Sequence, residues 1–141
     1  MGQSSEEVYA QVLIVLLSGE EIEMGKKTGE FRIGTSGWQY DHWKGVFYPP
    51  ELKTSQWFEH YAGRFDTVEV NNTFYHLPKA ETFDAWRGQA PRGFLYTLKF
   101  SRYGSHLKKL KDPADSISAF LDRAERLGDH LGVILVQLPP H

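Results

Sequence analysis

The segment 67–75 constrains the fold more than any other stretch of the 141-residue chain. In it the apolar Val68 and Val70 alternate with polar residues, which is the two-residue period of a β-strand whose faces meet different surroundings. The β-branched face is typical of a strand under a covering helix. The other face carries the carboxylate of Glu69 and the amide of Asn71 near the C-terminal end of the strand. Because α/β proteins usually build their sites at that end, the segment predicts where a site lies.

Strand and helix patterns alternate along the rest of the chain. Strand patterns cover 31–35, 67–72, 94–100 and 133–138, and helix patterns cover 54–65, 81–89 and 113–127. This order requires right-handed crossovers and a mostly parallel α/β sheet. Two closures fit: a small flavodoxin-like open sheet, or about four units of a TIM-barrel-like (β/α) barrel. Polar residues at strand C-terminal ends favour the barrel, namely Thr35, Glu69, Asn71, Lys99 and Gln137.

Composition narrows the class of protein. Hydrophobic residues make up 40%, charged residues make up 24% and the net charge is −2, so no general attraction to nucleic acid or anionic membranes is expected. The absence of cysteine excludes disulfides, a thiolate nucleophile and Cys-ligated metal sites, and it fits a cytoplasmic protein. The apolar run 8–17 has at most about half of the roughly 20 residues of a spanning helix, so we predict no membrane partner. We expect residues 1–30 to form an extension outside a domain at 31–141.

Several motifs occur in an order that is similar to one known family. They are Ile-Gly-Thr-Ser-Gly-Trp at 33–38, Trp43, Phe-Tyr-Pro at 47–49, Phe-Asp-Thr-Val-Glu-Val-Asn at 65–71, Thr-Phe-Tyr at 73–75, Leu-Pro at 77–78 and Val-Gln-Leu-Pro at 136–139. Together they resemble the DUF72 family, also called YecE-like, over about residues 31–140. The resemblance implies a TIM-barrel-like fold in a family of unknown biochemical function. It covers only the N-terminal half of the family domain.

A half barrel is expected to leave its first and fourth strands without neighbours. The fourth strand pattern, 133–138, is strongly apolar, which is typical of a parallel strand covered on both faces. An apolar edge strand promotes aggregation unless another chain pairs with it. We therefore expect a homodimer through the exposed sheet edges.

Glu69 and Lys99 are the candidate catalytic residues. Both are expected on inward faces of neighbouring strands, where Glu69 could act as a general base and Lys99 as its electrostatic partner. The open alternative is a buried ion pair that only positions the barrel mouth. Asn71 and Gln137 could orient a substrate through their amides, or they could satisfy loop carbonyls. Thr35 completes this set of polar strand-end residues.

The loop after the first strand is rich in aromatic residues: Trp38, Tyr40, Trp43, Phe47 and Tyr48. Such a loop is either a stacking platform for a sugar or base, or a small core that covers one end of the barrel, and we favour the core. Trp38 and Tyr75 are nevertheless candidate substrate-binding residues. Arg102 directly follows a strand, so it is a candidate for binding a phosphate-bearing ligand or a nucleic-acid backbone.

Three histidines, His42, His76 and His106, fall in loops on the same rim as Glu69. A His/Glu metal site is geometrically conceivable, but no HxH or HExxH spacing supports it, and we predict no metal and no cofactor.

From the candidate residues together we expect an enzyme-like barrel that acts on a small polar or phosphorylated molecule. The alternatives are a non-catalytic module that binds nucleic acid or sugar, and a non-functional fragment of a longer barrel.

Overall fold

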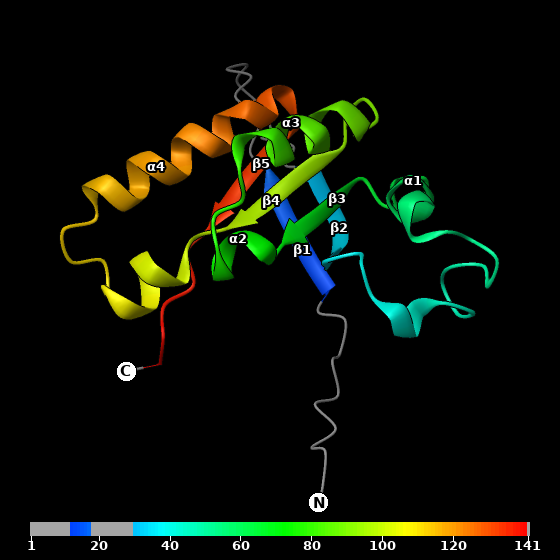
Figure 1. Ribbon diagram of the computed structural model, residues 1–141, viewed down its shortest axis with the longest axis horizontal. Coiled ribbons are helices and arrows are strands. Elements are labelled where there is room, and N and C mark those ends of the chain that lie inside the picture. The colour runs from blue at the N-terminus through cyan, green and yellow to red at the C-terminus, as the bar shows by residue number, and fades with distance from the viewer. Residues whose placement is uncertain (1–11, 18–29, 141) are drawn as a thin grey trace, which may run out of the picture.

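Strands and helices alternate through the part of the chain that the computed structural model describes, residues 12–17 and 30–140 (Figure 1). The strands are β1 (Val12–Leu17), β2 (Glu30–Ser36), β3 (Thr67–Val70), β4 (Leu95–Lys99) and β5 (Leu131–Leu135). The α-helices are α1 (Trp57–Ala62), α2 (Asn72–Tyr75), α3 (Ala80–Gln89) and α4 (Ala114–Ala124). Helical turns of other types are η1 (Asp41–Trp43), η2 (Thr54–Gln56), η3 (Tyr103–Leu107) and η4 (Glu125–His130). None of the helices in these ranges has the length and hydropathy to span a membrane.

One sheet carries all of these strands, in the order β1-β2-β3-β4-β5. The strands β2 to β5 are parallel, as the alternating pattern predicts, and β1 is antiparallel to β2. The expectation that β2 would be an unpaired edge is therefore wrong, because β1 pairs with residues 30–35 of this strand. Whether residues 1–30 belong to the domain stays a prediction, and most of them lie outside the described residues.

Helices cover one face of the sheet. Val68 and Val70 of β3 and Tyr96 and Leu98 of β4 are buried on this face among aromatic side chains of α1, α3 and α4. Figure 1 shows α3 and α4 lying across the same side of β4 and β5. The core is unusually aromatic: Phe58 stacks on Tyr96 with ring centroids 5.7 Å apart. The alternation seen at β3 in the sequence thus separates the helix-facing residues from the inner face.

Polar side chains of β2, β3 and β4 are aligned on the inner face of the sheet by strand register. Ser36 of β2 lies opposite Glu69 of β3, and Glu69 lies opposite Thr97 of β4. Gly34 shows how closely the backbones approach here, because a Cβ at this position would lie 2.2 Å from the carbonyl oxygen of Thr67. Only glycine allows β2 and β3 to pair in this register.

The aromatic loop between β2 and α1 forms part of the core. Tyr48 is 1% exposed, its ring stacks on Trp57 at 4.6 Å with an interplanar angle of 4°, and its hydroxyl donates to the carbonyl of Trp38. Trp43 and Phe47 pack against the same cluster. The favoured interpretation of this loop as a small core therefore agrees with the structure.

The last strand differs from the expectation for residues 133–138. β5 begins at Leu131 and ends at Leu135, so Gln137 lies beyond it. Its aliphatic side chains are not covered on both faces: Val133 and Leu135 are each 37% exposed. The sequence pattern is that of a fully buried strand, but in the described part of the chain β5 has a neighbouring strand on one side only.

Candidate functional site

Three side chains form a hydrogen-bonded chain at the C-terminal ends of β2 and β3. The Nδ2 of Asn71 donates to the Oγ of Ser36 at 2.5 Å, and that hydroxyl donates to the Oε1 of Glu69 at 2.7 Å. Because the amide can only donate here, the single hydroxyl proton of Ser36 is left for the carboxylate. Glu69 is 5% exposed and takes no part in the ion pairs formed by residues 30–140. The arrangement is a buried carboxylate held by one neutral donor, the Ser36 hydroxyl, which Asn71 fixes in turn.

Tyr40 adds a second hydroxyl to this group. It donates a hydrogen bond to the main-chain carbonyl of Ser36. Burial raises the pKa of Tyr40 above its usual value of 10.0, and the nearby charge of Glu69 raises it further. The phenol therefore stays protonated at neutral pH and can donate a hydrogen bond but cannot act as a base.

Lys99 does not pair with Glu69. The register places Thr97 beside Glu69, and Lys99 lies two residues further along β4, about 6.6 Å at the usual rise of a strand. Its Nζ lies 5.1 Å from the ring centroid of Phe74 in α2, a cation–π contact. The expected Glu69–Lys99 pair, catalytic or structural, is therefore not formed among the described residues.

The other predicted binding residues are spread over three environments. Thr35 faces the helix layer, where its backbone N–H donates to the hydroxyl of Tyr61 and its own hydroxyl donates to the carbonyl of Gly37. This position removes Thr35 from the inner face. Tyr75 is 70% exposed beside Phe74. Arg102 and Gln137 are exposed after β4 and β5. Their roles in binding stay predictions.

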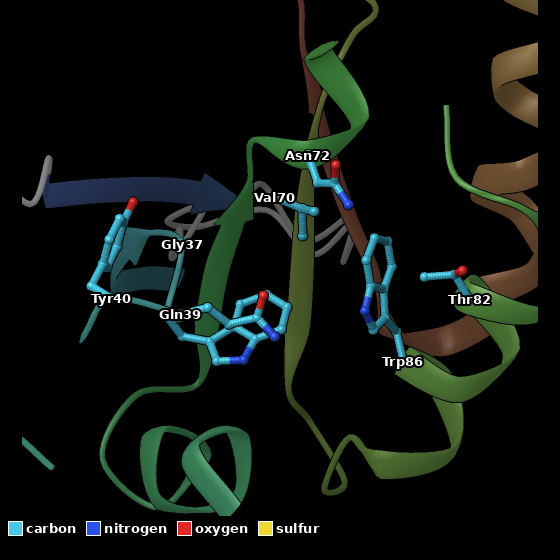
Figure 2. A pocket seen from close by; sticks show the side chains of 8 residues that line it. Gly37, Gln39, Tyr40, Val70, Asn72, Thr82 and Trp86 are labelled. Atoms are coloured by element: carbon cyan, nitrogen blue, oxygen red, sulfur yellow. The ribbon is translucent and has the colours of Figure 1, made fainter. Parts of the chain in front are cut away.

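A hollow beside this group is lined by residues of the β2–α1 loop, α2 and α3. Its volume is about 310 Å³. Trp38, which the sequence indicated as a binding residue, lines it together with Trp86 of α3 and Asn72 of α2. Tyr40 belongs both to this lining and to the hydrogen-bonded group at Ser36. Figure 2 shows Gln39 across the hollow from Thr82 and Trp86.

Among the described residues, no three His, Asp or Glu side chains converge to form a metal site. The Nδ1 of His106 forms a hydrogen bond with the Oγ of Ser105 at 2.9 Å, and the imidazole ring contacts the ring of Phe74. His60 bonds the carbonyl of Phe47, as a structural histidine does. These histidines thus act as local hydrogen-bonding groups.

Sequence reasoning missed Ser36 and Tyr40. Ser36 was part of the motif at 33–38, and it directly follows the first strand pattern, at 31–35. A polar residue at this strand end was the available signal, because parallel strands bring their C-terminal ends side by side. Tyr40 gave no such signal, since only the path of the loop returns its hydroxyl to Ser36.

Parallel β/α units with polar residues gathered at the strand C-terminal ends define a class, the α/β proteins built as part of a TIM-barrel-like fold. The chain matches the family described as "Protein of unknown function DUF72" over residues 32–141. It belongs to the DUF72 family. β1 lies outside the matched segment.

Similar proteins occur in several bacteria. The chain is 38% identical over 81 residues to the UPF0759 protein YecE of Escherichia coli (strain K12), which is 57% of this chain and 30% of that protein. It is 25% identical over 114 residues to the UPF0759 protein YunF of Bacillus subtilis (strain 168), 77% of this chain and 39% of that protein. A crystal structure of a DUF72 family protein from Thermotoga maritima matches with a TM-score of 0.65 and 35% identity over 75% of this chain and 43% of that one. The chain thus spans less than half the length of these relatives.

Proposed function

We propose that the C-terminal rim of the strands binds a small polar molecule, and that Glu69 acts on it as a general acid or base. The observation that carries the proposal is the contact between Ser36 and the buried carboxylate of Glu69. The serine hydroxyl fixes one carboxylate oxygen at 2.7 Å, and no cation in residues 30–140 forms an ion pair with this carboxylate. A carboxylate in that state can accept a proton from a ligand hydroxyl. A carboxylate paired with a lysine or an arginine is a weaker base, because the neighbouring positive charge lowers its pKa.

The neighbouring groups have roles that follow from their chemistry. Asn71 fixes the Ser36 hydroxyl and thereby the orientation of Glu69. Tyr40 stays neutral beside the carboxylate, and its hydroxyl, which donates to the main-chain carbonyl of Ser36, holds the end of β2 in place. Lys99 is the last residue of β4 and the exposed Arg102 follows this strand, so both would attract a phosphate group of a phosphorylated ligand at this rim. Hydrolase and isomerase chemistry both fit this set.

The test is turnover of a defined panel by the purified chain and its Glu69→Gln variant. The panel consists of p-nitrophenyl phosphate, p-nitrophenyl acetate and p-nitrophenyl glycosides. Glutamine keeps the shape of the side chain but cannot take up a proton, so we expect a loss of roughly 100-fold or more for any compound turned over. Glu59→Gln, at an exposed position of α1, is the control and should keep the rate. Equal turnover by the wild type and Glu69→Gln would contradict the acid–base role.

A non-catalytic binding module is the second candidate. Lys99 and Arg102 make no ion pair among the described residues, so both are available to a phosphate backbone. Binding of a short single-stranded oligonucleotide should then weaken steeply with salt and survive Glu69→Ala. Loss of that binding in the Lys99→Ala and Arg102→Ala double variant would separate this function from catalysis.

A further inference from the structure

The hollow between the β2–α1 loop, α2 and α3 shares only Tyr40 with the acid–base proposal. Its volume of about 310 Å³ suits a small ligand. In Figure 2 Gln39 lies on one side, Thr82 and Trp86 lie opposite, and Asn72 closes the top next to Val70. These groups come from four separate elements that the fold brings together.

The floor of the hollow is apolar and rigid. It consists of Trp38, Val70 and Trp86, which are 6%, 2% and 9% exposed. Trp38 packs edge-on against Phe58 at 5.4 Å, and Trp86 packs against Phe83 at 5.0 Å. Such contacts hold the indole rings in one orientation. The floor therefore offers fixed aromatic surface rather than side chains that must be ordered on binding.

The rim of the hollow is polar and available. Gln39 and Asn72 are exposed and Thr82 is half-buried. Within residues 30–140 the side chains of these three residues form no hydrogen bonds with the protein. The two amides supply both donors and acceptors, and the hydroxyl supplies one of each. The rim can thus satisfy several hydroxyl groups of a ligand at once.

The hollow carries no formal charge. None of the described residues that line it is acidic or basic, and its phenol, Tyr40, stays protonated because burial and Glu69 raise its pKa. A charged ligand would lose hydration here without gaining a partner of opposite charge. The hollow therefore favours an uncharged molecule.

We infer that this hollow binds the ring of an uncharged sugar. The apolar C–H face of a sugar ring packs on indole surface, while its hydroxyls radiate outward in several directions. The rim groups stand around the hollow in the same way, on the β2–α1 loop, α2 and α3 (Figure 2). A nucleobase would instead present most of its hydrogen-bonding groups along one edge of a plane. The inference does not depend on the role of Glu69.

Saturation-transfer NMR on the intact chain tests the inference. The probes are glucose, galactose, mannose and N-acetylglucosamine, with adenosine and glucose 6-phosphate for contrast. At least one neutral sugar should receive saturation and should shift the side-chain amide signals of Gln39 and Asn72, while adenosine and glucose 6-phosphate bind more weakly. Absence of saturation for all four neutral sugars would overturn the inference. Tighter binding of adenosine or of the phosphorylated sugar would overturn it as well.

Rim variants locate the binding. Asn72→Ala and Thr82→Ala each remove one hydrogen-bonding group and should lower the affinity for the sugar about three- to tenfold. Ser118→Ala changes an exposed hydroxyl on α4, away from the hollow, and should leave the affinity unchanged. All three positions avoid the buried floor, so folding is preserved and near-ultraviolet circular dichroism checks it. Sugar affinity that is the same in the rim variants and the wild type would show that the sugar binds elsewhere.

Discussion

The hydroxyl of Ser36 lies 2.7 Å from the Oε1 of Glu69, on two strands that are 33 residues apart in sequence. The parallel register of β2 and β3 places the two residues opposite each other. The contact joins the end of the first parallel strand to the buried carboxylate of the second. It therefore contributes to stability as well as to the candidate site.

Ser36→Ala should destabilise the protein. The substitution leaves the Glu69 carboxylate and the Asn71 amide without their shared partner at a buried position, which costs about 1–3 kcal/mol. Urea unfolding monitored by tryptophan fluorescence measures the change. Ser118→Ala, an exposed control on α4, should stay within about 0.5 kcal/mol of the wild type. A Ser36→Ala protein as stable as this control would show that the contact contributes nothing.

Gly34→Ala should destabilise the folded protein far more than Gly88→Ala, the same substitution in helix α3. A Cβ at Gly34 would lie 2.2 Å from the carbonyl oxygen of Thr67, so β2 and β3 would have to separate. We expect a loss of about 2–3 kcal/mol or more. Gly88 in α3 has open space around its Cβ position, and Gly88→Ala should stabilise by about 0.5–1 kcal/mol. Denaturant midpoints that move in the same direction for both variants would contradict the close approach.

Alkaline pH should reduce the contribution of Tyr40 to stability. Burial and the charge of Glu69 raise the pKa of this phenol above 10.0 in the folded state. The neutral phenol therefore makes its full contribution to the stability of the folded state below about pH 10. That contribution is lost as pH rises through the raised pKa, because the unfolded chain then releases its proton first. The stability difference between wild type and Tyr40→Phe should be constant from about pH 7 to 9 and shrink above about pH 10. A stability difference between wild type and Tyr40→Phe that increased above about pH 10 would contradict a raised pKa of Tyr40.

The apolar surface beside β5 predicts self-association. Ile117 and Leu121 of α4 are each 38% exposed, and they line a hollow of about 210 Å³ with Val136 and neighbouring apolar residues. β1 covers the β2 edge, whereas β5 has a free edge among the described residues. We expect a second copy of the chain to cover this side.

Light scattering over a range of concentrations measures that association. Val136→Lys should shift the mass toward that of a single chain, because a lysine would be buried without a partner. Val46, 88% exposed in the β2–α1 loop, provides the control Val46→Lys, which should associate like the wild type. A wild-type chain of single-chain mass at every concentration would rule out the dimer.

Part of the candidate site followed from local pattern. Glu69 was correctly placed near the end of a strand, with Val68 and Val70 turned to the helices, because side-chain direction alternates regardless of the rest of the fold. Asn71 was expected within the strand pattern 67–72, but β3 ends at Val70 and Asn71 directly precedes α2. Lys99 was expected beside Glu69 for the same reason, but alternation fixes only the face. The register of β3 with β4 fixes the position along it, and that register places Thr97 there.

The sequence by itself determined the alternation of strands and helices and the polar inner face of β3. It also determined the membership of the DUF72 family, through the motifs at 33–38 and 65–71. These are properties of short segments, set by the local period of apolar side chains. Tertiary structure alone decided that Ser36 holds Glu69, that Tyr40 returns to the same strand end and that β1 pairs with β2. Each of those contacts depends on register and on loop paths between distant segments, which no local pattern encodes.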